Sequence, residues 1–199
     1  PGPVLIDVPK DVQNNHGIYN GKPVITRLST KYKAKKLEIK KEAIDKAIEM
    51  MFNAKRPIFY TGGGVINSGD IASELLTKLV KTTSFPITST LMGLGAFPAS
   101  NQQFIGMLGM HGTYEANMAM QNCDVLIAIG ARFDDRVIGN PAHFAQNPRK
   151  IIHIDIDPSS ISKRVKVDVP IVGDVKDVLQ ELISQIREAQ LRPDGQALS

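Results

Sequence analysis

A polar loop with two arginines and two aspartates follows the most apolar run of the chain. Residues 125–129, VLIAI, predict a parallel strand that is buried on both faces. After Gly130, the loop carries Arg132, Asp134, Asp135 and Arg136. Ligands of open α/β sheets bind outside the carboxyl ends of strands, where guanidinium groups suit phosphate and carboxylates suit ribose. The alternative is a surface loop that pairs its own charges.

Three consecutive glycines, Gly62–Gly64, also follow a predicted strand and precede a helix. Their backbone N–H groups could approach an anion at a helix N-terminus. They do not complete the G-x-G-x-x-G fingerprint, because Asn67 occupies its third position and no acid lies about 20 residues on, where Thr82 and Thr83 stand. A nicotinamide site is therefore disfavoured, and a glycine turn without a ligand stays open.

Other candidate binding residues lie in loops and at strand ends. Two such segments are STLMGLG (residues 89–95) and MLGMHG (residues 107–112). Their glycines leave the backbone accessible to a ligand, and their leucines and methionines provide apolar surface, although each segment could simply fill the core. Asp155 and Asp174 end or follow predicted strands, where a carboxylate can accept from ribose or cap a helix. These residue types favour the binding of a nucleotide.

The same sequence offers no catalytic or metal-binding pattern. The four histidines are scattered, and the single cysteine, Cys123, cannot build a zinc site or an internal disulfide. G-x-S-x-G and phosphate-binding P-loop motifs are absent, and no nucleophile–base pair is evident. We therefore predict neither a catalytic residue nor a metal ligand in this chain.

Composition excludes several protein classes. The 199 residues are 42% hydrophobic, without an apolar run of membrane-spanning length or a signal peptide in residues 1–20. Of the net charge of +4, residues 31–41 supply +5, which leaves −1 for the remainder. A nucleic-acid-binding protein would spread positive charge over a folded face, whereas one lysine run indicates a solvated linker. We expect a cytoplasmic protein that binds neither nucleic acid nor membrane.

Apolar periodicity predicts an α/β fold. The expected strands are residues 1–9, 57–60, 86–89, 124–129, 150–156 and 167–172, and the expected helices are residues 39–51, 69–82, 113–121 and 175–188. Ser68 and Asp174 are expected helix caps, and Asp157 with Pro158 predicts another helix start. Alternation of strands with helices predicts a doubly wound, mainly parallel sheet of about six strands.

Taken in order, STLMGLG, MLGMHG, GARFDDRVIGN (residues 130–140), HIDIDP (residues 153–158) and GDV (residues 173–175) resemble the central domain of acetohydroxyacid synthase (acetolactate synthase) large subunits. That family uses thiamine diphosphate, and the resemblance covers about residues 1–187. The central domain of another thiamine-diphosphate enzyme, of the pyruvate oxidase or glyoxylate carboligase type, is an alternative. A stand-alone nucleotide-binding module is another.

The resemblance implies a division of the chain. Residues 1–13 would be the tail end of an amino-terminal pyrimidine-binding domain, and residues 14–38 would be a linker. Residues 39–188 would form the central FAD-binding-type domain, and residues 189–199 a frayed linker.

The resemblance also implies that this domain holds FAD, which performs no net redox chemistry in the main reaction. The implied contacts are Gly62, Gly63, Gly64, Thr90, Leu91, Met92, Leu108, Gly109, Met110, His111, Gly130, Arg132, Asp134, Arg136, Val137, Asp155, Ile156, Asp174, Val175 and, in the linker, Arg27. Asp155, Ile156, Asp174 and Val175 would hold the adenosine end.

The family condenses pyruvate with pyruvate or 2-ketobutyrate and releases carbon dioxide, in branched-chain amino-acid synthesis. Thiamine diphosphate and Mg²⁺ would be bound by other domains, because neither the activating glutamate nor the Gly-Asp-Gly…Asn motif occurs here.

Implied partners are the rest of the large subunit, further copies in a homo-oligomer and a small regulatory subunit. If the source is eukaryotic, the expected location is a plastid or a mitochondrion instead of the cytoplasm. The chain alone is expected to be inactive.

Overall fold

The computed structural model describes residues 3, 5–21, 37–144 and 148–191. Contacts between residues divide the chain into two compact units, Pro1–Lys35 and Lys36–Ser199. The second unit contains the sheet and the candidate site.

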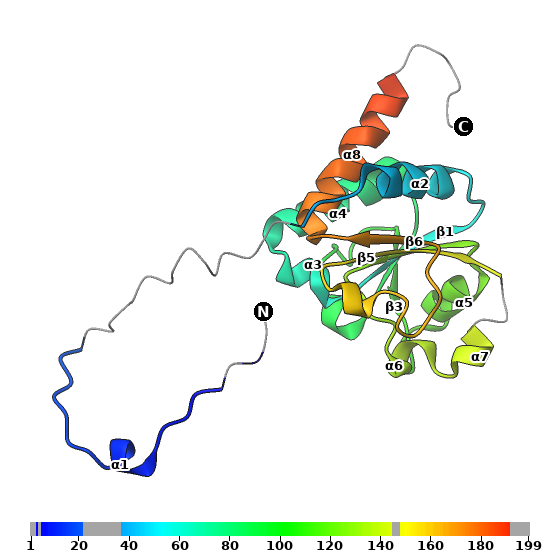
Figure 1. The fold of residues 1–199 in the computed structure, drawn as a ribbon. Helices are drawn as coiled ribbons and strands as arrows, with labels where there is room; N and C mark the ends of the chain where they lie inside the picture. Colours follow the sequence, from blue (N-terminus) through cyan, green and yellow to red (C-terminus); the bar gives the residue numbers. More distant parts are fainter. Residues whose placement is uncertain (1–2, 4, 22–36, 145–147, 192–199) are drawn as a thin grey trace. The chain divides into compact units, whose positions relative to one another are not determined.

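The second unit is built on one sheet of six parallel strands (Figure 1). The strands are β1 (Pro57–Thr61), β2 (Ile87–Ser89), β3 (Phe104–Met107), β4 (Val125–Ile129), β5 (Lys150–Asp155) and β6 (Val169–Val172). Their order across the sheet is β3-β2-β1-β4-β5-β6. The predicted doubly wound parallel fold is confirmed, and its topological switch point lies between β1 and β4.

Three long helices cover one face of the sheet: α2 (Lys41–Phe52), α4 (Asp70–Thr83) and α8 (Val175–Leu191) (Figure 1). Each turns an apolar stripe inward, as Leu76 of α4 and Leu182 of α8 illustrate with no exposed surface. They pack on alternate strand residues such as Phe59 and Ile127 to form the larger of two core clusters.

Shorter helices cover the other face: α5 (Tyr114–Asn122), α6 (Asp135–Ile138) and α7 (Pro141–Phe144). The intervening strand residues, among them Tyr60 and Leu126, form the second core cluster with Met120 and Phe144. Cys123 belongs to this cluster as a buried thiol whose Sγ donates to the carbonyl of Met120.

Most predicted elements lie within two residues of the observed ones, but β3 was missed. Phe104–Met107 is an edge strand whose residues are only partly buried, and its pairing with β2 shifts register between Ile87 and Ser89. Gly106 adopts φ +96° inside it. A short, irregular edge strand lacks both the alternating and the continuous apolar pattern on which the prediction depended.

The first unit holds one short helix, α1 (Lys10–Gln13). Residues 3 and 5–9, expected to be part of a strand of the preceding domain, form no strand here, and Leu5 and Ile6 are 94% and 79% exposed. A strand requires a neighbouring strand for its N–H and C=O groups, and no described residue of this unit provides one.

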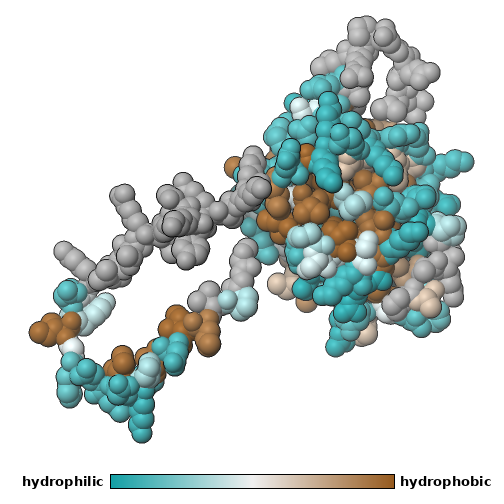
Figure 2. Space-filling model, in the orientation of Figure 1, coloured by the Kyte–Doolittle hydropathy of each residue, from teal (hydrophilic) through white to brown (hydrophobic). Residues whose placement is uncertain are grey.

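Figure 2 shows apolar side chains gathered over β6, the strand at one edge of the sheet. Exposed Pro170 lies within this strand and removes a backbone donor from the edge, which discourages the pairing of further strands. None of the helices in the described parts of the chain is long and apolar enough to cross a membrane.

Candidate functional site

The carboxyl ends of the six strands are joined by a row of backbone hydrogen bonds. From β3 toward β6, the bonds are Leu108 N to Ser89 O (3.2 Å), Thr90 N to Thr61 O (2.9 Å), Gly62 N to Ile129 O (3.0 Å), Gly130 N to Ile154 O (2.8 Å) and Gly173 N to Asp155 O (3.0 Å). Each bond ties the segment after one strand to a neighbouring strand end. The predicted site segments, although distant in sequence, therefore form one continuous edge.

Two glycines meet at the switch point between β1 and β4. Gly64 N donates to Gly130 O at 3.0 Å, and a β-carbon on Gly64 would lie 2.6 Å from the Cα of Gly130. Gly62 begins the short helix α3 (Gly63–Asn67), and its N–H is already used by β4. The glycines thus allow close backbone contact between two loops.

The β3 and β2 ends present apolar side chains to solvent. Leu91 and Met92, in the 3-10 helix η2 (Leu91–Gly93), are 70% and 75% exposed, and Met110 after β3 is 65% exposed. Their backbones are held firmly: Thr90 Oγ1 accepts from Gly93 N, and Asn117 of α5 exchanges two hydrogen bonds with Gly109. A fixed backbone with outward apolar side chains can serve as a wall for a flat ring.

The loop after β4 presents the charged groups. Arg132 and Asp134 form an exposed ion pair of 3.1 Å, and an Arg136 guanidinium nitrogen lies 3.7 Å from Met110 Sδ. Arg136 O also accepts from Met110 N at 2.8 Å, which ties this loop to the β3 end. An exposed ion pair contributes little to stability, so these charges remain available to a ligand.

The β5 and β6 ends carry the two predicted carboxylates. Asp155 is 8% exposed and accepts from Asp157 N at 2.9 Å. Asp174 accepts from Lys176 N at 3.0 Å and therefore caps α8, as predicted. Ser68 does not cap α4 as predicted, because its hydroxyl donates to Asp174 at 2.5 Å, and Gly69 occupies the N-cap position. Ser68 thereby joins the end of α3 to the start of α8.

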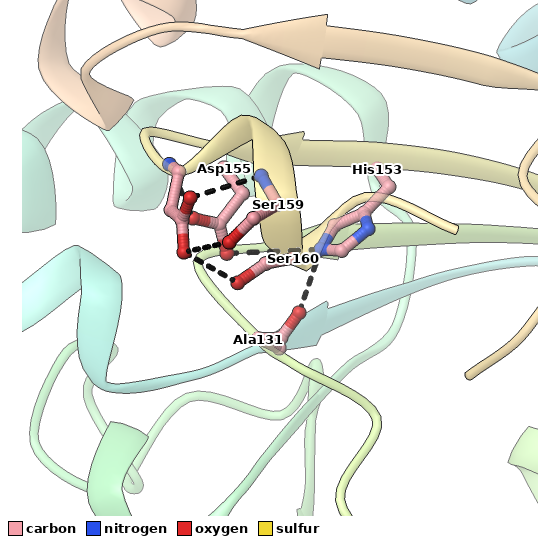
Figure 3. A network of polar contacts seen from close by, with 6 residues as sticks. Ala131, His153, Asp155, Ser159 and Ser160 are labelled. Carbon is pink, nitrogen blue, oxygen red and sulfur yellow. Dashed lines mark hydrogen bonds and ion pairs between the residues drawn. The ribbon is translucent and has the colours of Figure 1, made fainter. Parts of the chain in front are cut away.

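A buried histidine of β5 bonds to the loop after β4 (Figure 3). His153 Nε2 lies 2.7 Å from the carbonyl oxygen of Ala131 and 3.8 Å from Asp155 Oδ2. Because a carbonyl only accepts, Nε2 carries the proton, and Nδ1 is buried without a hydrogen-bond partner. Burial lowers the pKa of His153, and the nearby Asp155 carboxylate and the Ala131 carbonyl only partly oppose this shift. The imidazole is therefore neutral at physiological pH.

We expect this histidine to make the fold less stable in mild acid. The pKa of His153 in the folded protein lies below the ordinary value of 6.5. Its contribution to the free energy of unfolding is therefore constant above pH 6.5 and falls as the pH drops through 6.5 toward the folded pKa, because the unfolded chain then binds a proton that the folded chain does not. Urea unfolding at about pH 7.5 and about pH 5.5 should show a smaller difference for His153→Gln than for the unchanged chain. An equal difference in both proteins would contradict a buried, neutral His153.

The predicted site residues that the structure describes fall into three groups. The buried ones are Gly62, Leu108, Gly109, Gly130, Asp155 and Val175, and the exposed ones are Leu91, Met92, Met110, His111, Arg132, Arg136 and Ile156. The partly buried ones are Gly63, Gly64, Thr90, Asp134, Val137 and Asp174. Arg27 lies outside the described residues. Sequence reasoning missed Asn117 and Phe133, although an aromatic residue between Arg132 and Asp134 in a polar loop was a usable signal.

A separate hollow of about 530 Å³ lies at the amino end of β1 and is lined by Lys55, Pro57, Phe85 and Cys123, among others. It is at the opposite edge of the sheet from the polar loops. Ligands of open parallel sheets bind at the carboxyl ends of the strands, so we assign the candidate site to the polar loops at those ends and not to this hollow.

Comparison with known proteins agrees with this fold. The model of the thiamine pyrophosphate enzyme central domain matches residues 44–182. The chain is 48% identical over 192 residues to the acetolactate synthase large subunit of Buchnera aphidicola subsp. Schizaphis graminum, and 44% identical over 190 residues to the acetolactate synthase isozyme 3 large subunit of Escherichia coli. A probable acetolactate synthase large subunit of Methanocaldococcus jannaschii is 46% identical over 193 residues.

These alignments cover 94–96% of this chain but only 32% of each relative. The chain thus spans about a third of the length of the curated relatives that it matches. By the family model and by these identities, it belongs to the thiamine pyrophosphate enzymes and has the fold of their central domain, as found in acetolactate synthase large subunits.

Proposed function

We propose that this chain is the central domain of an acetolactate synthase large subunit and that its carboxyl edge binds FAD. The parent enzyme would condense pyruvate with pyruvate or 2-ketobutyrate and release carbon dioxide. Its relatives carry the name of this activity, and the fold is that of the central domain in enzymes that use thiamine pyrophosphate. Residues 39–188 would be the folded domain, with residues 1–13 belonging to the domain before it.

The order of side-chain types along the carboxyl edge supports FAD most directly. Exposed apolar groups of Leu91, Met92 and Met110 stand over β2 and β3, and the Arg132 cation follows β4. Carboxylates follow at β5 and β6. FAD has the same sequence of parts, namely an apolar ring system, a diphosphate and an adenosine. Five strand spacings give an edge of about 24 Å, which suits a dinucleotide lying across the switch point.

In this assignment, Met92, Met110 and His111 would border the flavin ring, and Arg132 and Arg136 would face the diphosphate. Asp155 and Asp174 would accept from the adenosine, together with the backbone of Ile156 and Val175. FAD would supply a structural element rather than redox chemistry. The residues present fit this role because the planar cations are exposed while the loops that carry them are hydrogen-bonded to their neighbours.

NAD is the weaker candidate. A nicotinamide-binding domain places an acid after its second strand to hold the ribose. Here β2 is followed by Thr90, Leu91 and Met92, of which Thr90 is occupied in holding η2. Thr82 and Thr83, which stand where the sequence motif would place the acid, bond to carbonyls of their own helix.

Thiamine diphosphate and Mg²⁺ are proposed as cofactors of the parent protein, bound outside these residues. The described residues contain no cluster of three or more His, Cys, Asp or Glu that could hold a metal ion. A small regulatory subunit is a proposed partner, because the relatives are named as large subunits. We propose a cytoplasmic location, or an organelle in a eukaryote.

Titration of FAD, ADP and NAD into the full-length protein and into this 199-residue chain tests the assignment. We expect the full-length protein to bind FAD and the chain to bind it at least about a hundredfold more weakly, because missing wall contacts worth about 3 kcal/mol have that effect. Submicromolar affinity of the isolated chain for FAD would contradict the shared pocket. Preference for NAD would indicate a stand-alone nucleotide-binding module instead.

Replacement of Arg132 by alanine in the full-length protein should weaken FAD binding by about tenfold or more, because a charge-assisted hydrogen bond contributes about 1.5–3 kcal/mol. Acetolactate formation should fall with it. Arg187→Ala is the matched control. Arg187 is also an exposed arginine, but it lies near the end of α8, whereas the start of α8 lies at the carboxyl ends of the strands. FAD fluorescence quenching measures both affinities, and equal values would show that Arg132 does not face the diphosphate.

A further inference from the structure

The loop after β4 turns on a residue that rarely adopts its conformation. Phe133 has φ +55°, in the left-handed region that strains side chains with a β-carbon. It is also 1% exposed, although Arg132 before it is exposed and Asp134 after it is half-buried. The left-handed turn therefore sends one ring into the core between two charged side chains that point outward.

Three rings hold Phe133 in this conformation. The ring centroids of Tyr60 and His153 each lie 5.3 Å from that of Phe133 in edge-on arrangements, and that of Phe144 lies 6.3 Å away. Such geometry is favourable between aromatic rings, and burial of the ring offsets the strained backbone. The conformation of the loop thus depends on packing beneath it.

His153 contacts the residues on both sides of Arg132. Its Nε2–H donates to the carbonyl of Ala131 at 2.7 Å (Figure 3). Its ring packs edge-on against Phe133 with an interplanar angle of 88°. Its own position is fixed within β5, where it pairs with Ala128 and Pro170. A single buried side chain therefore contacts the loop both before and after Arg132.

We propose that Phe133 and His153 are positioning residues that fix where Arg132 and Asp134 stand at the carboxyl edge, so that FAD affinity depends on two buried side chains that do not touch the cofactor. This inference rests on the proposed function. It extends the binding site inward, from the exposed charges to the aromatic cluster of Tyr60, Phe133, Phe144 and His153.

The first test compares two phenylalanine-to-leucine changes in the full-length protein. Phe133→Leu removes the ring beneath the loop, whereas Phe59→Leu removes an equally buried ring from the core cluster on the other face of the sheet. Both should lower the midpoint of thermal unfolding. Only Phe133→Leu should raise the Kd for FAD, by about tenfold, at a temperature where both variants are folded.

The second test uses His153 and remains informative if Phe133→Leu does not fold. His153→Leu removes the donor to Ala131, whereas His153→Gln keeps an N–H group that can reach the carbonyl. We expect His153→Leu to raise the Kd for FAD and His153→Gln to restore part of the affinity. In an Arg132→Ala background, His153→Leu should have a much smaller effect, because residues that act through one another are not additive.

The outcomes separate this inference from the proposed function. If the unmodified full-length protein does not bind FAD, the proposed function is wrong and the inference falls with it. If that protein binds FAD and His153→Leu binds it equally well, only the positioning role is wrong. A penalty from His153→Leu that is unchanged in the Arg132→Ala background also overturns it, because the histidine then acts on some other part of the site.

Discussion

Gly64→Ala should lower the thermal midpoint of this chain by about 5–10 °C, which corresponds to about 2–3 kcal/mol of unfolding free energy for overpacking in a domain of this size. The added β-carbon would lie 2.6 Å from the Cα of Gly130 and 3.0 Å from its carbonyl oxygen. Both are backbone atoms and cannot rotate away. The β1 and β4 loops would have to separate, which breaks the hydrogen bond from Gly64 N to Gly130 O.

Two other glycines provide graded controls for calorimetry. A β-carbon on Gly63 would lie 3.2 Å from Met92 Cβ and 3.3 Å from the Met92 carbonyl oxygen, which are milder overlaps than the 2.6 Å approach at Gly64, so Gly63→Ala should cost less. A β-carbon on Gly17 would meet nothing within 4 Å, so Gly17→Ala should leave the midpoint unchanged. If Gly64→Ala is as stable as Gly17→Ala, the two loops are not in close contact.

Elements whose pattern is set by burial were predictable from sequence. The continuous run Val125–Ile129 has every residue buried, because helices cover both faces of the sheet at β4. Asp157 accepts from Ser159 N in front of Pro158, as its residue types predict, and hydrogen bonds from Ser159 lower the pKa of the Asp157 carboxyl. In these places, local preference and tertiary structure favour the same conformation.

Other features were not predictable because a distant partner determines them. Ser68 has the residue type of a helix cap, yet its hydroxyl is taken by Asp174, 106 residues away. Gly62–Gly64 has the composition of an anion-binding turn, yet Gly62 N donates to Ile129 of β4 and Gly64 N donates to Gly130 in the loop after it. Phe133 in a left-handed conformation contradicts its local preference, and only the rings around it explain why it is tolerated.

We expect the purified 199-residue chain to form no acetolactate from pyruvate, even with thiamine diphosphate, Mg²⁺ and FAD supplied. The resemblance to acetolactate synthases implies that a glutamate hydrogen-bonded to the pyrimidine ring promotes removal of the C2 proton of thiamine diphosphate. It also implies a Gly-Asp-Gly…Asn motif that binds the metal ion and the diphosphate. Neither occurs among these residues, and Gly173-Asp174-Val175 is only a fragment of that motif.

Three carboxylates at the carboxyl edge bond to neighbouring groups of the domain. Asp174 caps α8 and accepts from Ser68, Asp155 accepts from Asp157 N, and Asp134 pairs with Arg132. His153 is buried beneath the loop with its proton on the nitrogen that holds Ala131. The arrangement fits the proposed binding and orientation of a dinucleotide.

The experiment requires a host that lacks acetolactate synthases of its own, because traces of such an enzyme would mimic activity. The chain and the full-length protein should be purified in parallel, and circular dichroism with a cooperative thermal transition should establish that the chain is folded. We expect acetolactate from the full-length protein alone. Acetolactate from the folded chain above a no-protein control would mean that a catalytic base exists within these residues. The same assay on variants of His111 and the strand-end aspartates would then locate it, because replacing the base would abolish turnover while leaving the fold intact.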